Sequence, residues 1–178
     1  MGGILTALLG SYAPVTSAFE SIASTVPTGS STVTFSSIPS TYKHLQLRIF
    51  ANDGGSNNII ARFNSDTGTN YTRHRLSGDG TSAAANGSIS QNFLSIADNN
   101  ASSNSYLTAA IYDIHDYTST TKYKTARGFS GYDANGSGYV ALYSGLWLST
   151  SAITSISVSM NSPWSTGSVI ALYGIKGA

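Results

Sequence analysis

Apolar and polar residues alternate in short runs along this chain, and this two-residue period is the feature that most limits its fold. In residues 44–50, Leu45, Leu47 and Ile49 fall on one side of the run, and Gln46 and Arg48 fall on the other. The same alternation recurs over residues 155–160. Because successive side chains of a strand point to opposite faces, such runs are typical of half-buried strands. No stretch shows the apolar face of a capped helix.

Clusters of Gly, Asn, Asp and Ser separate these runs, as turns between strands require. Examples are residues 52–58, 66–68, 78–80 and 133–138. Residues 81–88 and 98–105 are expected to be exposed loops. We therefore predict an all-β fold: an antiparallel β-sandwich of about ten strands, jelly-roll-like in its connections.

Composition supports the same class of fold. The chain contains 31 Ser and 19 Thr, and only 10% of its residues are charged, against roughly 25% in ordinary soluble domains. Hydroxyl side chains compete with helical hydrogen bonds, and Thr suits strands. Hydrophobic residues make up 40% of the chain. This is enough to form a hydrophobic core, so the chain is not expected to be disordered.

Charge and missing residue types narrow the possible partners. The formal net charge is +1, so no basic surface for nucleic acid is expected, and self-association meets little repulsion. The chain has no Cys, which excludes disulfides, thiolate nucleophiles and Cys-based metal sites. No apolar run reaches the roughly 18 residues of a membrane span, so no membrane partner is expected.

The first 17 residues are predicted to form an extended N-terminal docking arm, followed by a single sandwich domain over residues 18–178. The arm's candidate contact side chains are Ile4, Leu5, Leu8, Leu9 and Tyr12. Exposed on a monomer, they would form an apolar patch of the kind that marks an interface. No Lys or Arg precedes Lys43, whereas a secretory signal begins with positive charge.

Aromatic residues supply further interface candidates within residues 139–149. Tyr143 and Trp147 share one strand face there, and the other face is aliphatic, with Val140, Leu142, Leu146 and Leu148. If the aliphatic face is the core, Tyr143 and Trp147 point outward, where such rings anchor partners or stack on sugars. If the strand is buried on both faces, they belong to the core, and both interpretations remain open. Trp164, after Pro163 in a predicted loop, is another candidate for contact.

No arrangement of residues indicates catalysis. Asp113 and Asp116 flank His115, but Asp116 is more typical of a turn after a strand, and no nucleophile is fixed beside it. The chain has one Glu and seven Asp, most of them in turn clusters, which leaves no carboxylate pair for acid–base work. We expect no enzyme, no catalytic residue and no cofactor.

Metal binding is not expected either. Residues 133–138 match the first positions of a calcium loop, but Ser144 stands where the bidentate Glu should be, and both flanks look like strands. A hairpin turn explains these residues. The Arg-His-Arg sequence of residues 73–75 would repel a cation, so we expect an exposed strand face there or a contact with an anionic partner.

Several stretches resemble small structural proteins of tailed bacteriophages. They are residues 35–48 (Phe-Ser-Ser-Ile-Pro-Ser-Thr-Tyr-Lys-His-Leu-Gln-Leu-Arg), 113–117 (Asp-Ile-His-Asp-Tyr), 120–124, 152–156 and 172–177. The resemblance extends from about residue 19 to the end of the chain. It implies a virion component, and it supplies no catalytic residues. We expect the chain to lie on the outer surface of the particle.

Within that class, the expected function is a capsid decoration, or cement, protein that binds and stabilises the major capsid protein lattice. The single domain with an arm, and without a fibre-like repeat, favours this function. The expected partners are the major capsid protein and copies of the chain itself, as a homotrimer. One alternative is a tail-fibre or tail-associated protein that recognises a host receptor such as a glycan. A second alternative is a carbohydrate-binding domain.

Overall fold

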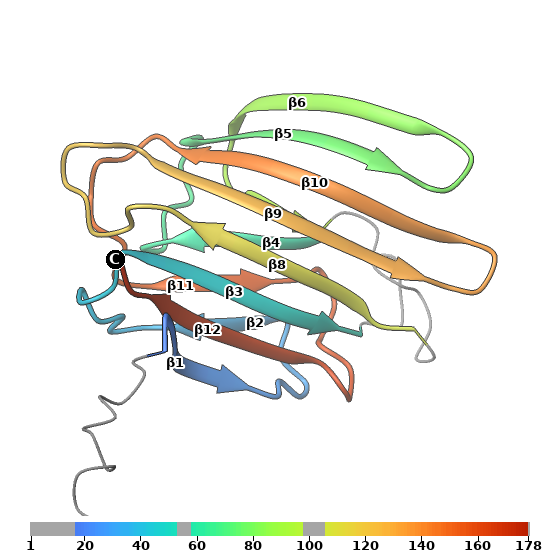
Figure 1. Cartoon of the computed structure of the whole chain (residues 1–178), viewed down its shortest axis with the longest axis horizontal. Coiled ribbons are helices and arrows are strands. Elements are labelled where there is room, and N and C mark those ends of the chain that lie inside the picture. The colour runs from blue at the N-terminus through green and yellow to red at the C-terminus, as the bar shows by residue number, and fades with distance from the viewer. Residues whose placement is uncertain (1–16, 53–57, 98–105, 178) are drawn as a thin grey trace, which may run out of the picture.

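The computed structural model describes residues 17–52, 58–97 and 106–177, which fold into two antiparallel sheets that share one core (Figure 1). The larger sheet has eight strands, in the spatial order β1 (Phe19–Thr25), β12 (Val169–Ile175), β3 (His44–Ala51), β8 (Thr108–Ile114), β9 (Lys124–Asp133), β10 (Gly138–Trp147), β5 (Tyr71–Gly78) and β6 (Ala83–Gln91). The smaller sheet has four, in the order β2 (Thr32–Phe35), β11 (Ile156–Ser159), β4 (Ile59–Phe63) and β7 (Leu94–Ala97).

The predicted all-β fold and antiparallel β-sandwich are confirmed. The described residues form twelve strands where about ten were expected. The main difference is β6, which occupies most of the predicted loop over residues 81–88. β6 lacks large alternating side chains, so its pairing with β5, and not its own pattern, makes it a strand. The other predicted loop, residues 98–105, lies outside the described residues.

The chain alternates between the two sheets. β2, β4, β7 and β11 belong to the smaller sheet, and the strands that lie between them in sequence belong to the larger one. Strands distant in sequence therefore become neighbours, as where β1 pairs with β12 and β2 pairs with β11. Jelly-roll connectivity stays a prediction, as does the division into an arm of residues 1–17 and a domain of residues 18–178.

Inward-facing side chains of both sheets form the core. In β3, Leu45, Leu47 and Ile49 are buried, which confirms the face predicted from their alternation. In β11 of the smaller sheet, Ile156 and Val158 are buried in the same cluster. Alternation thus identified the core face wherever the opposite face of the strand was polar.

Tyr112 of β8 packs against one glycine in each of the next two strands of the sheet, β9 and β10. A Cβ on Gly128 of β9 would lie 2.1 Å from Cδ2 of the Tyr112 ring. A Cβ on Gly145 of β10 would lie 3.1 Å from the Tyr112 hydroxyl and 2.4 Å from Cδ2 of Leu94. Tyr112 is fully buried, and burial raises the pKa of its hydroxyl. The ring therefore occupies the space that side chains at both glycines would need.

Candidate interaction surface

The structure places the predicted aromatic anchors of β10 in the core. Tyr143 and Trp147 are 3% and 2% exposed, whereas Leu142 on the opposite face is 52% exposed. Of the two interpretations left open for this strand, the outward orientation of Tyr143 and Trp147 is therefore wrong. Both side chains belong to the core, although the opposite face of the strand is not buried as the other interpretation expected. The physical reason is size, because the large rings bury more apolar area and fill the space between the two sheets.

Trp147 is held in place by specific contacts. Its indole Nε1 donates a hydrogen bond to Asp66 Oδ2 at 2.7 Å. Its ring stacks on Tyr71, with centroids 6.3 Å apart, and meets Phe63 edge-on at 5.6 Å. Burial raises the pKa of Asp66, but hydrogen bonds from Trp147 and from the turn after Asp66 outweigh it and hold that pKa below its usual value.

Trp164 is also buried, so the prediction that it is an exposed contact residue is wrong. Its backbone N–H donates to the carbonyl oxygen of Ser30 at 2.9 Å, which holds its loop against the segment before β2. The arm residues predicted to make contacts, Ile4, Leu5, Leu8, Leu9 and Tyr12, lie outside the described residues. Their role stays a prediction.

Exposed apolar side chains gather instead on the outer face of the larger sheet. Six of them, each between 43% and 54% exposed, come from five adjacent strands: Phe50 (β3), Ile111 (β8), Phe129 (β9), Val140 and Leu142 (β10), and Leu76 (β5). The register places Ile111 opposite Phe129, Phe129 opposite Leu142, and Leu142 opposite Leu76, in one row across the sheet. We name these six residues the outer apolar face.

Small residues leave the outer apolar face hollowed. Ala109 and Gly131 lie between Phe50 and Val140 in a second row across the sheet. Two hollows, of about 360 and 390 Å³, lie on either side of Phe129. Six large side chains that are half exposed offer on the order of 500 Å² of apolar area, and patches of that size on monomers are often functional.

A row of polar residues borders the outer apolar face. Across the sheet, Gln46, Asp113, Arg127, Ser144 and His74 lie opposite one another in turn. The side-chain Nε2 of Gln46 donates to Asp113 Oδ1 at 2.7 Å. Both signs of charge therefore lie beside the apolar row, as in the polar rim of a protein interface.

The Arg-His-Arg sequence divides between the two faces of β5. His74 is exposed, as predicted, whereas Arg73 and Arg75 are half-buried on the opposite face. Arg73 Nη1 donates to the hydroxyl of Ser95 at 2.8 Å. The expected exposed face therefore holds for His74 alone, and contact with an anionic partner stays a prediction.

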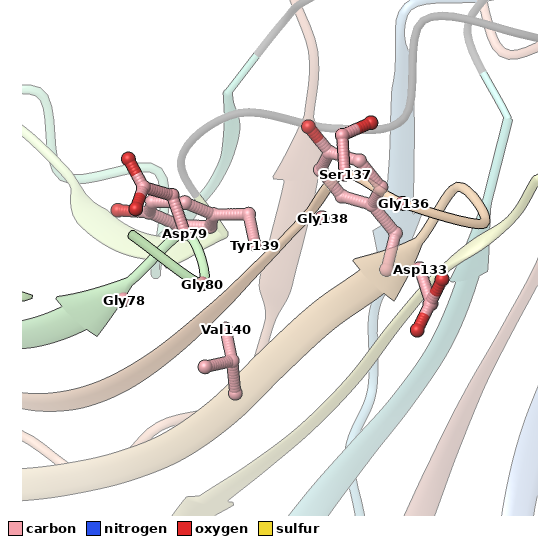
Figure 2. A pocket seen from close by; sticks show the side chains of 10 residues that line it. Gly78, Asp79, Gly80, Asp133, Gly136, Ser137, Gly138, Tyr139 and Val140 are labelled. Carbon is pink, nitrogen blue, oxygen red and sulfur yellow. The ribbon is translucent and has the colours of Figure 1, made fainter. Parts of the chain in front are cut away.

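A pocket of about 330 Å³ between the β5–β6 and β9–β10 turns contains Asp79 and Asp133 (Figure 2). Asp79 Oδ1 accepts hydrogen bonds from the backbone N–H groups of Ser82 and Thr81, which hold its pKa well below the usual range. Asp133 accepts a backbone hydrogen bond within its own turn, and the hairpin predicted at residues 133–138 is confirmed. Residues 17–52, 58–97 and 106–177 contain no group of three acidic or His side chains placed to hold a metal ion.

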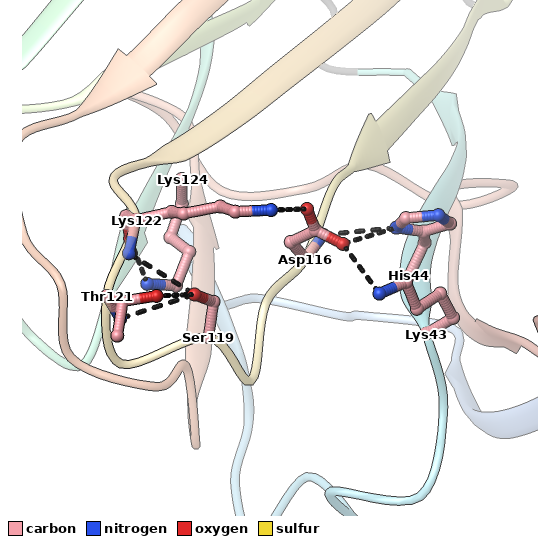
Figure 3. A network of polar contacts seen from close by, with 7 residues as sticks. All are labelled: Lys43, His44, Asp116, Ser119, Thr121, Lys122 and Lys124. Atoms are coloured by element: carbon pink, nitrogen blue, oxygen red, sulfur yellow. Dashed lines mark hydrogen bonds and ion pairs between the residues drawn. The ribbon is translucent and has the colours of Figure 1, made fainter.

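Asp116 is the centre of a polar cluster after β8 (Figure 3). Its carboxylate forms ion pairs with Lys43 at 3.3 Å and Lys122 at 3.4 Å, and the hydrogen bond from Lys43 is the main cause of its lowered pKa. Its backbone N–H donates to His44 Nδ1 at 3.0 Å, and its carbonyl accepts from the N–H of Ser119. The turn predicted at Asp116 is confirmed, and its carboxylate helps to hold that turn beside the start of β3.

Lys124, beside this cluster, is a fully buried lysine at the start of β9. Its Nζ donates to the carbonyl oxygens of Lys122 at 2.8 Å, Thr150 at 3.1 Å and Ser149 at 3.5 Å. Burial lowers the pKa of its ammonium group. The hydrogen bonds to Ser149 and Thr150 tie the start of β9 to the segment that follows β10.

We expect mild acid to destabilise this end of the sandwich through His115. Burial, followed by the positive charge of Arg127, lowers the pKa of His115 from 6.5, and Arg127 Nε donates to His115 Nε2 at 3.2 Å. The unfolded chain then takes up a proton before the folded chain does, so stability should fall as pH drops below 6.5 toward the folded pKa. Above that range, His115 should have no effect. The lowered pKa values of Asp116 and Asp66 add a loss only in stronger acid, below about pH 4.

Thermal unfolding at about pH 7.5, 6.5 and 5.5 checks this expectation. The Tm of the wild-type chain should fall by a few degrees across the range, and the Tm of His115→Gln should fall less. A decrease of the same size in the variant would show that another group is responsible.

Comparisons with known proteins assign no family. No protein-family model, no curated protein and no solved structure matches the chain. Within the described residues, no helix has the length and apolar character needed to cross a membrane.

Sequence reasoning missed the outer apolar face, although a signal for it exists. Ile111 and Phe129 occupy positions between the buried residues of their own strands, and Leu142 does the same in β10. A strand that is apolar on both sides is expected either to be buried on both faces or to expose one apolar face to solvent. Only the structure shows that nothing within the described residues covers these side chains.

Proposed function

We propose that this chain is a structural protein of a tailed-bacteriophage particle, and specifically a decoration protein that binds the major capsid protein lattice. The outer apolar face is the observation that carries the proposal. The stretches that resemble phage structural proteins supply the class of particle, and the face supplies a surface for attachment. The location on the outer surface of the virion belongs to the same proposal. The homotrimer expected from the sequence is a separate prediction, which attachment to the capsid does not require.

The low charge of the chain suits such a role. A decoration protein is present in many copies on one shell, so neighbouring copies must not repel each other strongly. A formal net charge of +1 keeps that repulsion small. The polar row beside the outer apolar face contains both signs of charge, at Asp113 and Arg127, and can orient a partner without requiring a strongly charged one.

A glycan-recognising role receives less support. It depended on outward rings at Tyr143 and Trp147, and both are core residues.

A tail-associated position is the competing location within the particle, and the number of copies per particle distinguishes it from decoration of the capsid. A number of copies per particle comparable to that of the major capsid protein supports decoration. A handful of copies would overturn it.

The double variant Phe129→Ser/Leu142→Ser tests the face directly. It removes two exposed apolar side chains from the centre of the face, so the fold should persist while capsid binding weakens by about 30-fold or more. Co-sedimentation with capsids that lack the protein measures the binding. Val26→Ser changes an exposed apolar residue directly after β1, outside the outer apolar face, and is the matched control, expected to bind like the wild-type chain.

Equal binding by the double variant and the wild-type chain would refute attachment through the outer apolar face. A chain that lacks residues 1–17 tests the docking arm separately, and we expect it to bind more weakly than the intact chain.

A further inference from the structure

We propose that two copies of this chain join through β6, each extending the larger sheet of the other by antiparallel pairing about a two-fold axis near Ala85. β6 lies at one end of the larger sheet, along the top edge in Figure 1, and β5 is its one strand partner among the described residues. The far side of β6 therefore presents a row of backbone N–H and C=O groups, which is a template for another strand.

The other three sheet edges are short, or are interrupted by a bulge and a charge, whereas the irregularity of β6 lies near its end, beyond Ser88. β2 and β7, the edges of the smaller sheet, are four residues long. β1, the opposite edge of the larger sheet, has a bulge between Ser21 and Ala23. It also has the charged Glu20, which pairs with Lys176 at 2.9 Å. Short strands, bulges and charges are the devices by which proteins keep sheet edges from pairing.

β6 combines length, neutrality and an uncovered apolar side chain. It has nine residues, none of them charged and none of them Pro. Its pairing with β5 is regular from Ala83 to Ser88, and its irregularity lies beyond Ser88. Ile89, on the same strand, is 75% exposed, the highest value for a large apolar side chain among the described residues.

The turn that leads into β6 is fixed in the single chain. Asp79 Oδ1 accepts from the N–H groups of Thr81 at 2.9 Å and Ser82 at 2.7 Å, and the Asp79 N–H donates to the Ser82 carbonyl at 3.2 Å. A strand held in position in this way loses less conformational entropy when it pairs, so association costs less.

A second copy fits this edge better than an unrelated peptide. Peptides that add a strand to a sheet are selected by pockets for alternate side chains, whereas residues 83–88 are only Ala, Asn, Gly and Ser. Antiparallel pairing about a two-fold axis is self-complementary, and uncharged β6 strands bring no like charges together. An axis at Ala85 places Ala83 opposite Gly87 of the other copy, so small residues meet.

The pairing also continues the outer apolar face. Leu76, which ends the apolar row on β5, lies opposite Ala85 of β6. Across the axis, Ala85 of one copy lies opposite Ala85 of the other, and the row runs on to the second Leu76. Two copies therefore present one extended apolar surface, which neither has alone.

Charge placed at the axis tests the proposal. The wild-type chain should sediment as a dimer in analytical ultracentrifugation and dissociate on dilution. Ala85→Lys sets two lysines opposite each other and should raise the dissociation constant about ten-fold, as should Ala85→Asp. A mixture of the two variants should recover the dimer, because Lys of one copy then meets Asp of the other. A chain that merely misfolds would not be rescued by mixing.

Ser24→Lys on the protected β1 edge is the matched control and should stay dimeric, as should Leu142→Ser on the outer face. A wild-type chain that is monomeric at all concentrations would overturn the proposal, and so would a trimer, which two-fold pairing cannot produce. A dimer unaffected by either Ala85 variant, or a mixture that stays monomeric, would overturn it as well. Capsids do not enter this experiment, so this inference and the proposed function can fail separately.

Discussion

Gly128→Ala should destabilise the protein by about 3 kcal/mol, because the new methyl group has no room. Its Cβ would lie 2.1 Å from the Tyr112 ring and 3.1 Å from the carbonyl oxygen of Ile111. Tyr112 is fully buried between the sheets and cannot turn into solvent. Urea unfolding measures the loss, and Gly78→Ala is the matched control. A Cβ on Gly78 meets atoms only at 3.7 and 4.0 Å, so that variant should be neutral or slightly more stable.

Shortening the tyrosine should relieve the clash. In the double variant Gly128→Ala/Tyr112→Leu, the ring atoms nearest the new methyl group are gone, so the total loss should be smaller than the sum of the two single losses. Additive losses, or a Gly78→Ala loss as large as that of Gly128→Ala, would contradict the packing described for Tyr112.

Trp147→Ala should cost about 3–5 kcal/mol, as expected for a buried aromatic side chain. The variant loses the stacking on Tyr71 and the edge contact with Phe63, and it removes one of the hydrogen-bond donors to Asp66. Leu142→Ala, on the opposite face of the same strand, should change stability by less than about 1 kcal/mol.

The two variants together test which side of β10 faces the core. The loss of stability in Trp147→Phe should lie between the losses of these two variants, because phenylalanine keeps most of the ring packing and loses only the indole hydrogen bond. If Leu142→Ala were the more damaging of the two alanine variants, the aliphatic face of β10 would be the buried one after all.

The contrast between β3 and β10 shows what the sequence can predict. β3 has apolar residues on one face, and the other face is polar except for Phe50, so its alternation identifies both the strand and its buried side. β10 is apolar on both faces, so its alternation identifies only the strand. The buried side is decided by Phe63 and Tyr71, which come from other strands to surround Trp147. Such neighbours cannot be found from the local pattern.

The outer apolar face could not be predicted for a related reason. Each of its residues is visible in the sequence, but the row of Ile111, Phe129, Leu142 and Leu76 exists only through the register of four strands.

The strand β6 is still harder to predict from the sequence. Its small, uncharged residues have a low propensity to form strands, and its backbone hydrogen bonds with β5 keep it extended.

The pairing of β1 with β12 has a consequence for the synthesis of the chain. The first strand has the last strand as its partner, and β2 pairs with β11, so neither sheet can be completed before residues 156–175 have left the ribosome. Until then, the early strands emerge without their partners and expose apolar residues and open edges. A premature stop before β11 should therefore yield an aggregating fragment and not a smaller folded protein.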